Sequence, residues 1–199
     1  MALMLHTAEV HVATFDTLRE TLAPGLALRH LVRPDWLAEA RAGRAEALRP
    51  QIAALIAGAD GPVVCTCTTL GPLAEELGAL RVDRPMMQQA ARIGRRILMV
   101  YVLESTRAPS LGLLESLTAP GAEVRPLPLP EAWPLFETGD SAAFHAHIAE
   151  AIRTALRDGG VDVVVLAQAS MAGAAALLGD LGLPVLTSPH QAMRALSAG

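Results

Sequence analysis

The sequence contains no lysine and no asparagine, and aromatic residues make up only 3% of its 199 residues. Without lysine the chain cannot form a Schiff base, which excludes the ordinary chemistry of pyridoxal phosphate. Hydrophobic residues nevertheless make up 52% of the chain, so the interior must be built from Ala, Leu and Val. That filling is typical of helices packed on a buried parallel sheet. The composition therefore favours an α/β fold.

Long apolar runs and clusters of positive charge are also missing. No stretch reaches the roughly 20 residues that a membrane span needs, and the first residues lack the basic segment and cleavage site of a secretory leader. The net charge of -4 and the scattered arginines leave no basic stripe for a phosphate backbone. We therefore expect a cytoplasmic protein whose partners are small molecules, with neither nucleic acid nor membrane among them.

The chain has two cysteines, Cys65 and Cys67, separated by one residue. This spacing is too short for an unstrained disulfide, and two cysteines are too few for a structural zinc site. His145 and His147 lie two apart in a predicted helix, so they point to different faces and cannot share a metal. We predict two free thiols and no metal site.

Short apolar runs alternate with longer amphipathic segments, which predicts βα units on a parallel sheet. The predicted strands are Leu3–His6, Leu26–Val32, Pro62–Cys67, Arg96–Leu103, Glu123–Leu127, Val161–Ala167 and Pro184–Thr187. Helices fill the intervals, and one should begin just after Thr69, where Pro72 is tolerated in the first turn. Ser170 and Ser188 are predicted helix N-caps.

A proline-rich stretch and a later helix complete this prediction. The segment from Val124 to Pro134 contains four prolines, so it is predicted to be a loop that leaves a short strand. After it, Asp140 and Ser141 should open a helix that runs to about Arg157. The glycine pair that follows should end this helix.

Two segments of the chain align with each other without gaps, residues 63–78 with residues 164–179. Each segment contains a buried strand, a small polar turn and a helix, and each is followed by a proline-led helix with glutamine and arginine. This repeat predicts two similar lobes, residues 1–95 plus 182–199 and residues 96–181. Cys67 and Gln168 are the corresponding residues of the two lobes.

In open parallel sheets, ligands bind at the carboxyl ends of the strands, and Cys67 lies at such an end. A cysteine just before a helix has its thiolate stabilised by the helix dipole and the unpaired backbone N–H groups, which predicts a pKa below the free value of about 8.5. The same N–H groups, with the hydroxyls of Thr68 and Thr69, would bind a carboxylate without a basic side chain. Cys65 is predicted to be a core residue.

The sequence Cys67-Thr-Thr-Leu-Gly after an apolar strand resembles the first catalytic cysteine motif of the aspartate/glutamate/hydantoin racemase superfamily. The resemblance also includes four further segments: the strand end His6-Thr7, the connection Arg81-Val-Asp-Arg-Pro-Met86, the turn Ser105-Thr106 and the stretch Val164–Met171. It implies an enzyme without a cofactor, folded into two pseudo-symmetric α/β lobes with the site between them. In such enzymes two facing cysteines remove and return a proton beside a carboxylate.

The sequence departs from that pattern at Gln168, where the second cysteine would lie. Glutamine can hydrogen-bond but cannot carry a proton. Three readings remain open: a one-thiol isomerase that uses Cys67 covalently, a decarboxylase in which Cys67 protonates one face of an enolate, or an enzyme in which His6 or His190 supplies the second base. A carboxylate-binding protein without catalytic activity, and a thiol-dependent hydrolase, are the alternatives of other classes.

The predicted site contains Cys67, His6 and His190 as catalytic residues, and a small carboxylate as substrate. The predicted substrate-binding residues are those with hydroxyl or amide groups at strand ends and helix starts: Thr7, Thr68, Thr69, Ser105, Thr106, Gln168, Ala169 and Ser170. Arg81, Asp83 and Arg84 are expected to face solvent, as charged residues between elements usually do. The Ala-rich surface is compatible with a homodimer.

Overall fold

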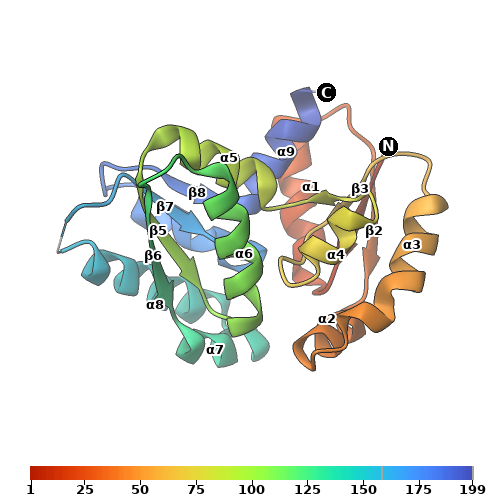
Figure 1. Ribbon diagram of the computed structural model, residues 1–199, viewed down its shortest axis with the longest axis horizontal. Helices are drawn as coiled ribbons and strands as arrows, with labels where there is room; N and C mark the ends of the chain where they lie inside the picture. The colour runs from red at the N-terminus through yellow and green to blue at the C-terminus, as the bar shows by residue number, and fades with distance from the viewer. Residues whose placement is uncertain (158, 199) are drawn as a thin grey trace. The chain divides into compact units, whose positions relative to one another are not determined.

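The computed structural model describes residues 1–157 and 159–198 and divides into two compact units (Figure 1). Unit 1 comprises residues 1–84 together with the segment from Pro189 onward, and unit 2 comprises residues 85–188. The chain thus passes from one unit to the other immediately before Pro85 and again immediately before Pro189. The division proposed from the repeat put these passages at residues 95 and 181.

Unit 1 is built on a parallel four-stranded sheet with the strand order β2-β1-β3-β4. Its strands are β1 (Ala2–His6), β2 (Leu28–Val32), β3 (Val63–Cys65) and β4 (Leu80–Arg81). Its helical elements are α1 (Val10–Leu22), α2 (Pro34–Arg41), η1 (Ala45–Leu48), α3 (Arg49–Ala57), α4 (Gly71–Glu76) and α9 (Ser188–Ala198). These strands match the predicted ones within a few residues, except that the two-residue β4 was not predicted.

Side chains alternate between the two faces of this sheet, as the pleat of a strand requires. Leu3 and Leu5 of β1 pack in one apolar cluster with residues of α2, α3 and α4. Met4, between them, packs on the other face with Phe15 of α1 and Met193 of α9. The sheet is therefore covered on both faces, which explains why its strands read as continuous apolar runs.

Unit 2 repeats this plan with the strand order β6-β5-β7-β8, again all parallel. Its strands are β5 (Arg96–Tyr101), β6 (Glu123–Pro128), β7 (Val163–Leu166) and β8 (Val185–Thr187). Its helical elements are α5 (Arg84–Ile93), α6 (Glu104–Leu117), η2 (Pro130–Ala132), α7 (Trp133–Glu137), α8 (Ser141–Ala155) and η3 (Ala169–Leu178). The two parallel sheets flanked by helices confirm the predicted fold class.

The core of unit 2 shows the same two-sided packing. Leu98 and Val100 of β5 pack with α8 and η3, whereas Ile97 and Met99 pack with α5 and α6. In Figure 1, α8 lies on one side of the β5–β8 sheet and α5 and α6 lie on the other. Met86 of α5 is fully buried in this core, so α5 belongs to the packing of unit 2.

The proline-rich stretch contains more structure than predicted. Pro126 and Pro128 lie within β6, which pairs with β5 alone. An edge strand tolerates proline because one row of its backbone groups has no partner strand. The prediction of a loop beyond this strand was wrong, because η2 and the short helix α7 follow it. Pro134 is the second residue of α7, where the missing N–H is not needed.

The predicted helix caps had different outcomes. Asp140 caps α8 as expected, with its Oδ1 accepting the N–H of Ala143 at 3.0 Å. Ser170 does not cap, because η3 begins one residue earlier, after Gln168. Ser188 is the first residue of α9, and its buried Oγ has no hydrogen-bond partner among the described residues. The cap predictions for Ser170 and Ser188 were therefore wrong.

Two further observations concern membrane and metal. No helix within residues 1–157 and 159–198 combines the length and the apolar character needed to cross a bilayer. Over the same part of the chain, no three His, Cys, Asp or Glu side chains are grouped so that they could hold a metal ion.

Candidate functional site

Cys67 and Gln168 occupy equivalent positions in the two sheets. In unit 1 the backbone N–H of Thr66 donates to the carbonyl of Leu5, the last but one residue of β1, at 2.9 Å. In unit 2 the backbone N–H of Ala167 donates to the carbonyl of Val100, the last but one residue of β5, also at 2.9 Å. Cys67 and Gln168 are the next residues along the chain, so each begins the turn that leaves the third strand of its sheet.

The Cys67 sulfur lies among hydrogen-bond donors at the carboxyl end of β3. The Thr7 hydroxyl donates to it from the end of β1, and the backbone N–H groups of Thr69 and Leu70 donate to it from the turn before α4. The Thr69 side chain makes a further hydrogen bond to the same sulfur. Cys67, Thr7 and Thr69 of the predicted site are therefore brought together.

The protonation of Cys67 differs from the sequence-based expectation. Burial raises the pKa of the Cys67 thiol above its ordinary value, and the hydrogen bonds from Thr7, Leu70 and Thr69 act in the opposite direction without overcoming it. The side chain is only 7% exposed. The expected lowering of the pKa was wrong. Burial removes the water that would stabilise the thiolate, and the hydrogen bonds from the short turn replace only part of that stabilisation. The resting group is a thiol within a ring of thiolate-stabilising donors.

Cys65 has a different environment, although it is two residues away. It is 1% exposed and packs in the apolar cluster of unit 1, as predicted. Burial is the main cause that raises its pKa. Its Sγ–H donates to the Cys67 carbonyl at 3.5 Å. Cys65 therefore supports the backbone of the turn and does not present its sulfur to solvent.

The remaining predicted residues of unit 1 are placed as follows. Thr68 is buried, at 4% exposure, and its carbonyl accepts the N–H of Gly71, which closes the turn before α4. His6, the last residue of β1, is fully buried. His190 is partly exposed in the first turn of α9. The proposed role of His190 as the second base stays a prediction.

Gln168 is fixed by two backbone donors of its own unit. Its Oε1 accepts the N–H of Val102 at 2.7 Å and the N–H of Leu103 at 2.9 Å, in the turn that joins β5 to α6. The residue is 7% exposed. Because the oxygen already has two partners, the amide N–H₂ group is the part of this side chain that remains for another acceptor.

The other predicted residues of unit 2 lie at helix starts. Ser105 and Thr106 are in the first turn of α6, which begins at Glu104, the residue after the two whose N–H groups hold Gln168. Ala169 and Ser170 open η3. The Ser170 carbonyl accepts from the Nε2 of His145 at 3.2 Å. All four residues therefore lie at helix starts that follow strands β5 and β7, at the carboxyl end of the second sheet.

A buried ion pair beneath the Cys67 turn was missed by the sequence analysis. Arg81 and Asp83 form a two-pronged pair, with Nε–Oδ1 at 2.9 Å and Nη2–Oδ2 at 2.7 Å. They are 6% and 0% exposed, so the expectation that they face solvent was wrong. A Cβ at Gly71 would lie 3.0 Å from the Arg81 Nε. This close approach favours glycine at the start of α4, but the glycine does not show in the sequence that the ion pair is buried.

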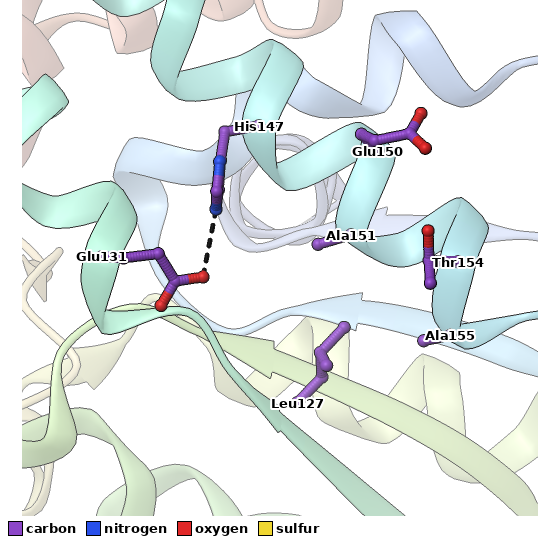
Figure 2. A pocket seen from close by; sticks show the side chains of 7 residues that line it. All are labelled: Leu127, Glu131, His147, Glu150, Ala151, Thr154 and Ala155. Carbon is purple, nitrogen blue, oxygen red and sulfur yellow. Dashed lines mark hydrogen bonds and ion pairs between the residues drawn. The ribbon is translucent and has the colours of Figure 1, made fainter.

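Two cavities lie in unit 2, away from the predicted residues. One, of about 430 Å³, is lined by Leu127, Glu131, His147, Glu150, Ala151, Thr154 and Ala155. Figure 2 shows it between β6 and α8, with His147 and Glu131 joined at its edge, 3.0 Å apart. The other, of about 290 Å³, lies at the amino end of β5, beside Arg96 and Gly160. Neither cavity is lined by a residue of the predicted site.

Comparison with known proteins gives structural similarity only. No protein-family model matches the sequence, and no curated protein matches it either. Among solved structures, aspartate racemase from Picrophilus torridus has a TM-score of 0.71 at 14% identity, over 98% of this chain and 91% of that one. Glutamate racemase from Bacillus anthracis has a TM-score of 0.73 at 14% identity, over 100% and 80% of the two chains.

Allantoin racemase from Klebsiella pneumoniae is also similar, with a TM-score of 0.67 at 20% identity, over 100% of this chain and 86% of that one. At such identities a likeness shows the fold. The similarity extends over the whole chain and includes racemases of two amino acids and of allantoin. The chain therefore has the fold of the aspartate, glutamate and allantoin racemases, as the resemblance of its sequence implied.

Proposed function

We propose that this protein is a racemase- or isomerase-like enzyme that needs no cofactor and acts on a small carboxylate through the Cys67 thiol. The observation that carries the proposal is the ring of donors around the Cys67 sulfur, formed by the Thr7 hydroxyl and the N–H groups of Thr69 and Leu70. These donors would stabilise a thiolate at the moment when it forms. The shared fold of the racemases supports the same reading.

The chemistry follows from a thiol that is neutral at rest. The thiol would first lose its proton to solvent, and the thiolate, held by its four donor groups, would take the proton from the carbon beside the carboxylate; the carbanion or enolate formed would later take a proton back from the sulfur. The desolvated thiolate is a strong base toward a proton on the carbon beside a carboxylate. Gln168 takes no part in the proton transfer, because an amide does not titrate.

This asymmetry leads to a specific expectation for the reaction. With one thiol and one amide, the proton leaves and returns at the same sulfur, so hydrogen exchange with solvent should outrun inversion of configuration. In our proposal the Gln168 N–H₂ group hydrogen-bonds a substrate oxygen, while its own oxygen stays bound to the N–H groups of Val102 and Leu103. The cellular setting proposed is the cytoplasm.

The experiment is incubation in D₂O with aspartate, glutamate, small dicarboxylates such as maleate, and hydantoins including allantoin. Proton NMR follows exchange at the carbon beside the carboxylate or its equivalent, and chiral chromatography follows inversion. We expect exchange with the natural chain and with Cys65→Ala, and none with Cys67→Ala. Equal loss in both cysteine variants would exclude Cys67 as the reacting group.

The alternative function is a carboxylate-binding protein without turnover. The observation that favours it is the raised pKa of Cys67, since a buried neutral thiol is also compatible with an inert one. Thermal-shift measurements on the same compounds separate the two functions, because a ligand stabilises the folded state whether or not it reacts. Stabilisation without exchange or any new product would establish the binding function. A new decarboxylated or hydrolysed product would assign the other thiol chemistries instead.

A further inference from the structure

Unit 1 contains a buried chain of hydrogen bonds that ends at the residue before Cys67. His6, at the end of β1, is 0% exposed, and both of its ring nitrogens have partners. Its Nδ1 lies 2.9 Å from the Thr66 Oγ1. Its Nε2 lies 2.8 Å from the Nδ1 of His30 in β2. The Nε2 of His30 lies 3.4 Å from the Asp16 Oδ1 of α1, at the protein surface.

The positions of the hydrogens in this series of hydrogen bonds follow from the Thr66 hydroxyl. The Thr66 Oγ1 lies 3.1 Å from the Leu5 carbonyl oxygen, and only the hydroxyl can supply the proton between these two oxygens. The same hydroxyl must then accept from His6, so the Nδ1 of His6 carries a hydrogen. Burial and the neighbouring histidines lower the pKa of His6 to about 3, so the ring is neutral near pH 7.

The rest of the chain is then determined. A neutral ring with hydrogen on Nδ1 has a bare Nε2, which can only accept, so the Nδ1 of His30 must donate to it. The Nε2 of His30 lies 3.4 Å from the Asp16 Oδ1, and donation to this carboxylate as well requires hydrogens on both nitrogens of His30, that is, a cationic ring. The order of donation therefore runs from His30 to His6, from His6 to Thr66, and from Thr66 to the carbonyl of Leu5.

The second unit lacks this arrangement at the equivalent positions. The counterpart of His6 at the end of β5 is Tyr101, and the counterpart of Thr66 is Ala167. Neither alanine nor a strand-end tyrosine reproduces a hydroxyl held by an imidazole. The series of hydrogen bonds through His6 is thus present in the unit that carries the thiol and absent at the equivalent positions of the other unit, although both sheets share one strand order.

We infer that His6 is a positioning residue, which holds Thr66 and with it the turn that presents Cys67 to its donors, and that His30 and Asp16 fix the ring of His6 in the required tautomer. The inference rests on the proposed function and assigns His6 a role other than the second base. Because both ring nitrogens are occupied within a buried site, the ring has no free position from which to exchange a proton with a substrate.

The tautomer is tested directly by ¹⁵N NMR of the full chain labelled at histidine, with assignment by single substitutions. We expect the His6 signals of a neutral ring with hydrogen on Nδ1 at pH 7, which stay unchanged down to about pH 5. Hydrogen on Nε2, or titration of His6 between pH 6 and 7, would overturn the inference. This measurement requires no substrate, so it stands even if the proposed function fails.

The role is tested with matched variants in a Cys65→Ala background. His6→Asn keeps an N–H group at the position of Nδ1 but cannot shuttle a proton, whereas His6→Leu keeps neither property. Thr66→Ser keeps the hydroxyl, and Thr66→Val removes it at nearly constant shape. If His6 acts by positioning, His6→Asn and Thr66→Ser should stay within about 3-fold of the natural kcat, and the other two should lose about 10-fold to 100-fold.

The rate of Cys67 alkylation as a function of pH provides a readout that does not depend on turnover. We expect the midpoint to move in His6→Leu and Thr66→Val and to stay in His6→Asn and Thr66→Ser. Circular dichroism identifies a variant that fails to fold, and the conservative partner at the same position then carries the test. Equal losses in His6→Asn and His6→Leu, with Thr66→Val unaffected, would assign His6 as an acid or base and refute positioning.

Discussion

Cys67 and Gln168 begin equivalent turns in two sheets of the same strand order, yet their surroundings differ in kind. The Cys67 sulfur accepts hydrogen bonds from the hydroxyls of Thr7 and Thr69 and from two backbone N–H groups, and the thiol is a group that can lose or gain a proton. The Gln168 oxygen accepts hydrogen bonds from two backbone N–H groups, and its amide is a group that cannot titrate. One scaffold thus supplies backbone donors at both positions, and the side chain decides whether they surround a titratable group or a fixed one.

The largest effect expected from this comparison concerns turnover. Cys67→Ala should lower the rate of α-proton exchange by about 10²-fold to 10⁴-fold, the range for a lost proton-transfer group. Its free energy of unfolding should change by only about 1 kcal/mol, because a small side chain is removed. Exchange rates and urea unfolding measured on one preparation test both statements. Unchanged exchange in this variant would end the assignment of the thiol.

The buried ion pair of unit 1 should give the largest loss of stability. Asp83→Ala leaves the Arg81 guanidinium buried without its two-pronged partner, which costs about 3 to 5 kcal/mol. The residue equivalent to Arg81 at the end of β8 is Thr187, where no such pair is described. Thr187→Ala should cost less than about 1 kcal/mol. Similar unfolding free energies for the two variants would contradict this view of the pair.

In unit 2, the expected effect of Gln168→Ala is on stability. Removing Oε1 leaves the N–H groups of Val102 and Leu103 without their partner, which should cost about 2 to 4 kcal/mol. Gln168→Glu keeps an oxygen at this position and should cost less. Urea unfolding of the two variants tests the order. If alanine is tolerated as well as glutamate, the two hydrogen bonds contribute little to stability.

The smallest effect is a dependence of stability on pH that comes from unit 1. The pKa values of His6 and His11 are lowered to about 3 and about 4, mainly by burial. Below pH 6.5 the unfolded chain therefore binds protons that the folded chain does not, and stability falls as the pH decreases toward 4. The expected loss is about 1 kcal/mol per pH unit for each histidine.

Urea unfolding between pH 7.5 and 5, above the range in which most carboxylates titrate, measures this slope. His6→Asn is the matched variant and should remove about half of it, since one of the two histidines is then absent. A flat profile in the natural chain would mean that both rings accept protons in the folded state.

The fold could be predicted closely from the sequence because buried parallel strands leave an unmistakable pattern. The apolar runs that end at His6 and Cys65 are bounded by polar turns, and the internal repeat aligns Cys67 with Gln168 in sequence. The short β4 left no such pattern, since a two-residue strand has no periodicity. The helix α7 was hidden by the prolines before it and by Pro134, which is tolerated because it lies in the first turn of the helix.

The site was less predictable, since its properties depend on burial and on contacts distant in sequence. The donors of Cys67 were anticipated from its place before a helix, but the depth of the sulfur, which raises its pKa, was not. His6 was selected as a titrating group, and its contact with His30 lies 24 residues away along the chain. The pairing of Arg81 with Asp83 is local, but nothing in the sequence shows that it is buried.

The passage of the chain between the units has a consequence for the order of folding. Unit 2 is one continuous segment, whereas the core of unit 1 includes Ala192 and Met193 of α9, which follow all of unit 2 in sequence. During synthesis, unit 2 can therefore complete its packing as soon as it has left the ribosome. The apolar face of β1 and β3 that α9 covers stays partly exposed to solvent until α9 has been synthesised.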